Sequence, residues 1–370
     1  MDDYYLNFKN LLFFLGLLLL EMSYVAVNVV GIQNYLRVIK IFSFVLLLIS
    51  FLLSTKYELY SKNKLLAIFF ILFMSLIVFV KYEEPLMLEI ALVAINCVKK
   101  DFKTIVDYDI IIKLFLLFFI IFFHTLGLTN GAYEKIMRDD TIRSSLGFFH
   151  PNTLSMFSMM IIFEYLYLNK SNLVTKKFFV ALFLSIIFSK ITDSRTALYC
   201  TVILIAVSIF NRKKINHSCY TNRFFKFIVS NSFLIFLFLS ILISIMYLKN
   251  SLFAIRLNEA FNNRISYQSL FFRNYGVTLL GNNINYNITL DNGYLKLLLN
   301  FGIITVFIYL FVYLLNFKKG LQKDWLYVAI LEVILIYSLF ESSMLYVSYN
   351  IFFLYIFCSD DCQSKIITKK

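Results

Sequence analysis

Long apolar runs separated by short polar segments make up most of the chain. Residues 11–20 and 114–123 are unbroken apolar stretches, whereas the strands of a membrane β-barrel alternate apolar and polar residues. A helix that crosses a bilayer needs about 20 consecutive, mostly apolar residues. The pattern therefore predicts an all-α, polytopic helical bundle in a membrane.

Hydropathy windows of about 20 residues predict about twelve transmembrane helices in a single membrane domain, residues 1–370. The predicted spans are 11–32, 38–54, 65–80, 85–98, 109–128, 151–168, 178–190, 196–210, 227–248, 292–316, 325–340 and 343–358. Two long segments, 129–150 and 249–291, fall on the outer side as extracytoplasmic loops. Because they contain aromatic and apolar residues as well as charge, we expect packed amphipathic segments there.

Composition supports the same class and excludes others. Hydrophobic residues make up 60% of the chain and charged residues only 15%, far from the values of soluble domains. The chain has only 2 prolines and 10 glycines, too few for a collagenous, disordered or turn-dense β protein. No inward loop is long enough for a cytoplasmic catalytic domain, and no GxxxxGK[ST] phosphate loop occurs.

The distribution of cations predicts the orientation. Lysine and arginine are retained in short cytoplasmic loops, and most of them fall on the side of the amino terminus, which places both termini in the cytoplasm. This retention also explains the net charge of +13 without a nucleic-acid partner. Arg212 and Arg223 fall on the cytoplasmic side. The other seven arginines are predicted outside: Arg37, Arg138, Arg143, Arg195, Arg256, Arg264 and Arg273.

Arginine on the outer side suggests an anionic ligand, because its planar guanidinium binds phosphate oxygens in pairs. Three predicted helices also begin on that side, after His150, after Arg195 and after Asp291. Helix amino ends present unpaired N–H groups and a partial positive charge. Arg143, Arg195 and Arg264 lie in the adjoining segments, and together these features predict a site that clamps a diphosphate.

Each of these residues also has a purely structural interpretation. His150 precedes Pro151 and can simply cap a helix; Asp193 and Asp291 can be ordinary acidic caps, worth about 1 kcal/mol each. Glu341 can lie exposed at the end of a span. Charges within spans are costly and are functional candidates in their own right. Those residues are Glu21, Glu89, Lys113, Glu164, Lys296 and Glu332.

Four segments in the central half of the chain resemble a known family. They are RSSLGFFHPN at 143–152, DSRTA at 193–197, NNRI at 262–265 and LDNGYLKLLLNFGII at 290–304. Their order and spacing resemble the polysaccharide polymerases of bacterial O-antigen, capsule and exopolysaccharide assembly (Wzy type), relatives of the O-antigen ligases. Asn263 departs from the pattern, since many relatives have glycine before this arginine.

The resemblance implies a glycosyltransferase of the GT-C-like class in the bacterial plasma membrane. It implies transfer of a growing glycan from an undecaprenyl-diphosphate carrier to an incoming lipid-linked repeat unit on the outer face, with flippase and chain-length regulator proteins as candidate partners. No metal or soluble cofactor is required, because arginines can neutralise the departing diphosphate. The supporting polar residues of the same segments are Arg138, Asn152, Asp193, Asn292 and Arg273.

If the chain has this activity, we expect Arg143, Arg195 and Arg264 to hold the donor diphosphate. His150 orients or deprotonates the acceptor hydroxyl, with Asp291 and Glu341 as competing bases. Three alternatives stay open: an O-antigen ligase with the same donor and another acceptor, a flippase or transporter of lipid-linked oligosaccharides, and a structural or sensory membrane protein without catalysis.

Overall fold

A computed structural model describes residues 2–57, 72–73, 75–77, 79–81, 85–98, 100–130, 135–138, 141–172, 175–212, 223–282, 284 and 290–359. Within these residues the fold is helical apart from one short hairpin, which confirms the predicted all-α class. The chain divides into two compact units. Unit 1 comprises Met1–Leu76, Leu86–Ser194 and Leu354–Lys370, and unit 2 comprises Ile77–Pro85 and Arg195–Phe353.

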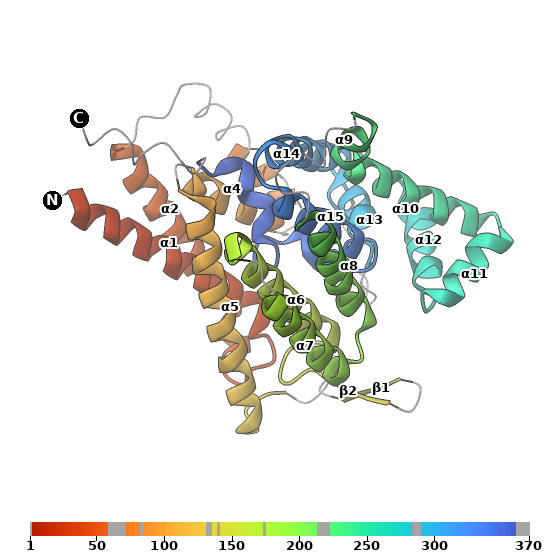
Figure 1. The fold of residues 1–370 in the computed structure, drawn as a ribbon, viewed down its shortest axis with the longest axis horizontal. Coiled ribbons are helices and arrows are strands. Elements are labelled where there is room, and N and C mark those ends of the chain that lie inside the picture. The colour runs from red at the N-terminus through yellow and green to blue at the C-terminus, as the bar shows by residue number, and fades with distance from the viewer. Residues whose placement is uncertain are drawn as a thin grey trace. The chain divides into compact units, whose positions relative to one another are not determined.

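Unit 1 is a helical bundle with a hairpin between its fourth and fifth described α-helices. Helix α1 packs against α2 and α5, α5 packs against α6, and α6 packs against α7 (Figure 1). The hairpin pairs Ile136 with Arg143 in antiparallel register. The elements are α1 (Asp2–Val25), η1 (Gln33–Tyr35), α2 (Leu36–Tyr57), α4 (Leu86–Cys97), α5 (Phe102–Thr125), β1 (Lys135–Arg138), β2 (Thr141–Ser144), α6 (Pro151–Leu168), η3 (Lys170–Asn172) and α7 (Thr175–Thr192).

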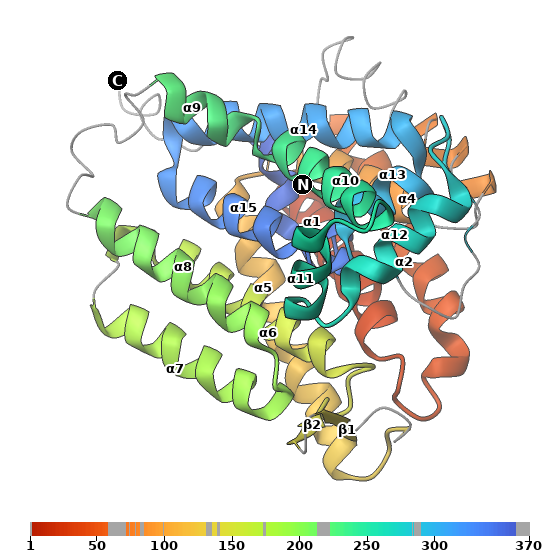
Figure 2. The ribbon, with the colours of Figure 1, turned by 90° about the vertical axis from the view of Figure 1, so that its right-hand side faces the viewer.

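Unit 2 contains both long and short helices. Helix α8 packs against α15, α14 packs against α13 and α15, and α12 packs against α10, α11 and α13 (Figure 2). The elements are α8 (Arg195–Arg212), α9 (Arg223–Ser230), α10 (Ser232–Leu248), α11 (Leu252–Ala260), α12 (Arg264–Tyr275), α13 (Gly293–Asn300), α14 (Gly302–Lys323), α15 (Trp325–Tyr337), η4 (Ser342–Leu345) and the first residues of η5 (Ile351–Phe357), which continues into unit 1 from Leu354.

The apolar helices support a helical membrane protein but do not confirm twelve spans. Within the described residues, the segments Asn7–Val25, Gln33–Leu53 and Gly302–Lys323 are long and apolar enough to cross a membrane. The bent pair α9 and α10 adds a fourth if it is counted as one span. Helix α4 has 12 residues and α15 has 13, so neither reaches the roughly 20 that a bilayer requires. The predicted span at 65–80 lies largely outside the described residues.

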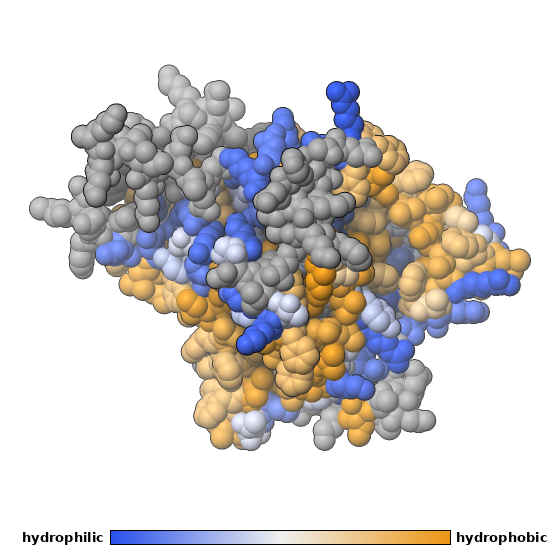
Figure 3. Space-filling view, viewed as in Figure 1, coloured by the Kyte–Doolittle hydropathy of each residue, from blue (hydrophilic) through white to orange (hydrophobic). Residues whose placement is uncertain are grey.

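Hydrophobic side chains reach the surface of the helices as well as their interior. Phe42 and Leu52 on α2, Phe118 on α5, Phe179 on α7 and Phe238 on α10 are all more than half exposed. Hydrophobic residues gather accordingly over the face shown in Figure 3. Apolar surface on this scale is unfavourable in water, so it supports helices that contact lipid.

Two predicted spans are interrupted in the structure. The predicted span 227–248 bends by 59° between α9 and α10. The predicted span 292–316 is divided into α13 and α14 at Gly302, whose φ is +83°. A Cβ at Gly302 would lie 2.2 Å from the backbone nitrogen of Gly281, so the close approach of the 279–281 segment requires glycine here.

The prediction of a twelfth span at 343–358 is wrong, because that segment forms the short 3-10 helices η4 and η5 instead. Side chains of α14 and α15 bind its carbonyl groups. Asn316 donates to the Phe353 carbonyl at 3.0 Å, and the Tyr327 hydroxyl donates to the Phe352 carbonyl at 2.9 Å. Irregular backbone is tolerated among apolar helices where protein buries it and supplies such partners.

Candidate functional site

Arg143 joins three elements of unit 1 and is buried. It lies on β2, where its Nε donates to the carbonyl of Thr192 at 2.8 Å. One of its terminal nitrogens donates to the side-chain oxygen of Asn152 at 2.5 Å. Arg143 thereby ties the hairpin to the carboxyl end of α7 and to the first turn of α6.

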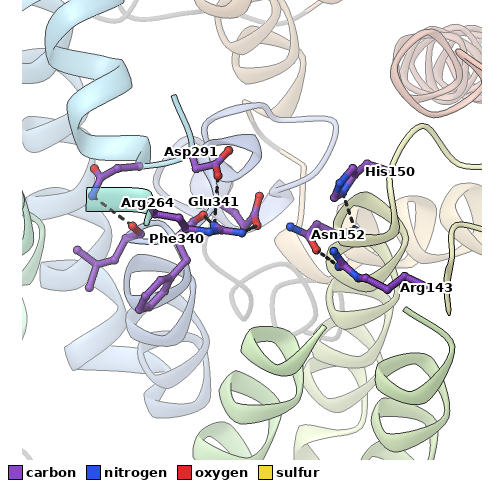
Figure 4. Close-up of polar contacts among 9 residues, drawn as sticks. Arg143, His150, Asn152, Arg264, Asp291, Phe340 and Glu341 are labelled. Carbon is purple, nitrogen blue, oxygen red and sulfur yellow. Dashed lines mark hydrogen bonds and ion pairs between the residues drawn. The ribbon is translucent and has the colours of Figure 1, made fainter. Parts of the chain in front are cut away.

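His150 caps helix α6, as the sequence predicted. Its backbone is extended, Pro151 occupies the first helical position, and the ring Nδ1 accepts a hydrogen bond from the Asn152 amide at 3.1 Å (Figure 4). The amide of Asn152 thus bonds to His150 while its side chain bonds to Arg143. The predicted site residues Arg143, His150 and Asn152 form one cluster, which we call the α6 cluster.

A tight turn at Asp193 lies at the end of the Leu86–Ser194 segment of unit 1. Asp193 has a φ of +46°, a left-handed conformation that aspartate adopts more readily than most residues. The Ser194 amide donates to the Thr192 hydroxyl at 3.3 Å. Helix α8 begins directly afterwards, with the exposed Arg195 as its first residue. Because unit 2 begins at Arg195, the α6 cluster and the groups of unit 2 are described separately.

Arg264, Asp291 and Glu341 form a second cluster, within unit 2, which we call the Arg264 cluster (Figure 4). The guanidinium of Arg264 lies 3.0 Å from a Glu341 carboxylate oxygen and 3.5 Å from an Asp291 carboxylate oxygen. It also donates to the carbonyl of Phe340. Side-chain exposures of 24% for Arg264, 14% for Glu341 and 35% for Asp291 leave the cluster accessible to a ligand.

The local fold positions Arg264 through two left-handed residues. Asn262 and Asn263 have φ values of +53° and +61°, and Arg264 begins α12 immediately after them. Asparagine is one of the few side chains that enter this region readily, so the turn is compatible with asparagine at position 263.

The electrostatics of the Arg264 cluster favour a charged guanidinium. Burial alone would lower the pKa of Arg264, but the carboxylates of Glu341 and Asp291 outweigh burial and raise that pKa above its ordinary value. Two carboxylates around one guanidinium leave these three groups with a net charge of about −1. The cluster thus provides both a charged hydrogen-bond donor and carboxylate oxygens able to accept a proton.

The start of α13 lies beside this cluster. Asn292, not Asp291, caps the helix: its side-chain oxygen accepts from the Leu295 amide at 2.9 Å. The Asn292 amide group donates to the carbonyl of Leu339 at 3.2 Å, and the Gly293 amide donates to the Ser338 carbonyl at 2.8 Å. These bonds hold the start of α13 against the segment that carries Glu341.

Arg195 belongs to the same end of unit 2. Helix α8 packs against α15, and Cys200 in the second turn of α8 lies near Tyr337, the last residue of α15. The amino end of α8 therefore lies beside the carboxyl end of α15, which Phe340 and Glu341 follow directly. A helix amino end and an arginine are both favourable for an anion.

Other predicted residues are not brought into these clusters. Arg273 is exposed in the last turn of α12, about 13 Å along the helix axis from Arg264. The backbone of Arg138 pairs with Thr141 in the hairpin, but its side chain lies outside the described residues. Among the residues that the structure describes, no group of three histidine, cysteine, aspartate or glutamate side chains has the arrangement of a metal site.

Sequence reasoning missed the backbone groups that fix both arginines. The carbonyls of Thr192 and Phe340 accept hydrogen bonds from Arg143 and Arg264, and nothing in a side-chain pattern identifies a carbonyl acceptor. Comparisons with family models, curated proteins and solved structures find no match to this chain. The family resemblance thus stays a prediction from the sequence motifs.

Proposed function

We propose that this membrane protein is a polysaccharide polymerase that joins lipid-linked repeat units on the outer face of the bacterial plasma membrane. The donor is a glycan on undecaprenyl diphosphate, and the acceptor is a sugar hydroxyl of another lipid-linked unit. The observation that carries the proposal is the accessible Arg264 cluster, which combines a guanidinium with two carboxylates beside the start of α13.

The chemistry requires both kinds of group. The acceptor hydroxyl attacks the anomeric carbon of the donor sugar, a new glycosidic C–O bond forms, and the C–O bond to the diphosphate breaks. Negative charge grows on the leaving diphosphate while the attacking hydroxyl loses its proton. Arg264 stabilises the developing negative charge by electrostatic and hydrogen-bond contacts, with Arg195 and the amino end of α8 as a second cationic contribution.

A carboxylate of the Arg264 cluster takes the proton from the acceptor hydroxyl. Glu341 is the better placed of the two, because it is less exposed and lies closer to Arg264 than Asp291 does. Asp291 then helps to orient Arg264.

In this proposal the α6 cluster mainly holds the chain in place and does not react with the substrates. Arg143 is buried and bonds to a backbone carbonyl and an amide, which are contacts that fix a turn. His150 uses Nδ1 to cap α6. Together they hold the RSSLGFFHPN segment and the amino end of α6 in a defined arrangement.

The direct test supplies purified protein with a chemically defined undecaprenyl-diphosphate-linked repeat unit and resolves the products by electrophoresis. A ladder of regularly increasing length, formed without nucleotide sugar or added metal, is the expected result. Transfer of the glycan only to a lipid A core acceptor would identify a ligase. Translocation of labelled lipid-linked units across vesicles without any extension would identify a flippase.

A further inference from the structure

A second set of charges lies deep inside unit 1, whereas the groups proposed for catalysis belong to unit 2. Glu21 on α1, Asp109 and Lys113 on α5, and Glu164 on α6 have no exposed surface. The Lys113 ammonium donates to an Asp109 carboxylate oxygen and, at 2.7 Å, to a Glu164 carboxylate oxygen. We call these four residues the buried carboxylate cluster.

The charges of this cluster do not balance when every group is ionised. Three carboxylates and one ammonium give a net charge of about −2 at neutral pH in the ordinary ionisation states. Removing one unpaired charge from water costs several kcal/mol, and these helices are apolar along most of their length. A fully ionised cluster is therefore incompatible with its surroundings, and positive charge must be bound.

The surroundings of Glu21 indicate where this positive charge is bound. Within the described part of the chain, neither carboxylate oxygen of Glu21 accepts a hydrogen bond, although the side chain is completely buried. The group that faces it is Asp109, which is itself a carboxyl group and donates a hydrogen bond only when protonated. One oxygen of Asp109 and one of Glu164 also lack a donor among the described residues.

The positive charge can be a metal ion or a proton. The described residues contain no arrangement of three carboxyl, histidine or cysteine groups that holds a metal ion. A proton needs only two facing carboxyl oxygens, and it provides the donor that both members of such a pair lack. Glu21 and Glu164 each face Asp109, so each has an acceptor for a carboxyl O–H.

We propose that the buried carboxylate cluster is a binding site for two protons. Glu21 and Glu164 carry them and donate to Asp109, which stays ionised and pairs with Lys113. This arrangement is neutral, because one carboxylate faces one ammonium. It also gives hydrogen-bond partners to oxygens that have none otherwise, and it joins α1, α5 and α6. The site is independent of the proposed glycosyl transfer.

The neighbouring helices carry other ionisable groups that form separate contacts. On the helices beside α1, Lys40 of α2 pairs with Glu89 of α4 at 3.0 Å, next to Tyr24. On α7, beside α6, Lys177 bonds to Asn169 at 2.7 Å. The remaining charged groups of α2, α4 and α7 are Arg37, Lys176 and Lys190, together with Lys56 near the end of α2.

Infrared difference spectroscopy tests the assignment, because a protonated carboxyl group and a carboxylate absorb at different frequencies. The full-length protein in detergent at neutral pH should show absorption of buried protonated carboxyl groups that exchanges slowly in deuterated water. Glu21→Gln and Glu164→Gln should each remove one such component. Glu341→Gln, which alters an accessible carboxylate, is the control and should remove none. Absence of a protonated component, or no change in Glu21→Gln and Glu164→Gln, overturns the proposal.

Stability against pH provides a second, independent measurement. The folded state binds protons that the unfolded state releases at neutral pH, so the thermal midpoint should fall as pH rises. The double variant E21Q/E164Q keeps the shape and neutrality of the protonated pair, and it should fold and lose most of this dependence. A double variant that is strongly destabilised at neutral pH, or that keeps the full dependence, would show that the two glutamates are ionised in the native protein.

Discussion

Arg143 and Arg264 have the same predicted function, yet the fold holds them in opposite ways. Arg143 is buried and bonds to the Thr192 carbonyl and to Asn152, so it joins a hairpin to two helices. Arg264 is partly exposed and lies between the carboxylates of Asp291 and Glu341. The comparison separates an arginine that connects elements of the fold from one that the proposed function uses in the reaction, a distinction that depends on partners and exposure.

The largest effect should come from Arg264→Gln. We expect polymer formation by the purified protein to fall by about 10²- to 10³-fold, because one charged donor to the developing diphosphate is lost. The thermal midpoint should change little, since the carboxylates left behind are accessible to water. Arg256→Gln, which alters an exposed arginine on α11, is the matched control and should retain activity. Equal activity of the two variants would contradict the reactive role of Arg264.

Glu341 and Asp291 allow the two carboxylates to be ranked. Glu341→Gln should reduce the rate by about 10²-fold, as expected when a general base is removed. Asp291→Asn should cost less than about tenfold, because Asp291 is more exposed and farther from Arg264. Rates measured against pH distinguish them further: the fall of rate at low pH, where the base is protonated, should disappear only in Glu341→Gln. The reverse ranking would make Asp291 the base.

Arg143→Ala should act mainly on stability. Two hydrogen bonds from a charged donor are lost in a buried position, so we expect the free energy of unfolding to fall by about 2 kcal/mol. Thermal unfolding in detergent measures this, with Ile142→Ser as the control, since Ile142 is exposed on the same strand. Activity per folded molecule should be largely kept. A variant of native stability with no activity would move Arg143 into the reactive site.

Several local features of the site could be read from the sequence because they depend on neighbouring residues. The dipeptide His150–Pro151 specifies a cap followed by a first helical residue, and α6 begins as predicted. Long apolar runs likewise specified α1, α2 and α5. The left-handed turn at Asn262 and Asn263 was not predicted, although asparagine adopts that region more readily than most residues.

Features that depend on contacts between residues far apart in the sequence could not be predicted from local sequence patterns. The segment 343–358 is as apolar as a span, but its carbonyls are bound by Asn316 and Tyr327, so it need not form a continuous helix. The break at Gly302 depends on the close approach of Gly281. The pairing of Arg264 with Glu341 joins residues 77 positions apart, and no local pattern encodes it.

The smallest effect concerns His150 and determines whether the α6 cluster is only structural. His150→Ala removes the acceptor for the Asn152 amide, and loss of a cap should cost about 1 kcal/mol of stability. His150→Asn supplies another side-chain acceptor at the same position, so stability should return to near the native value. If His150 only caps α6, His150→Asn should also restore polymer formation. A stable His150→Asn protein that forms no polymer would instead show that the imidazole transfers a proton, and the α6 cluster would join the Arg264 cluster as a reactive group.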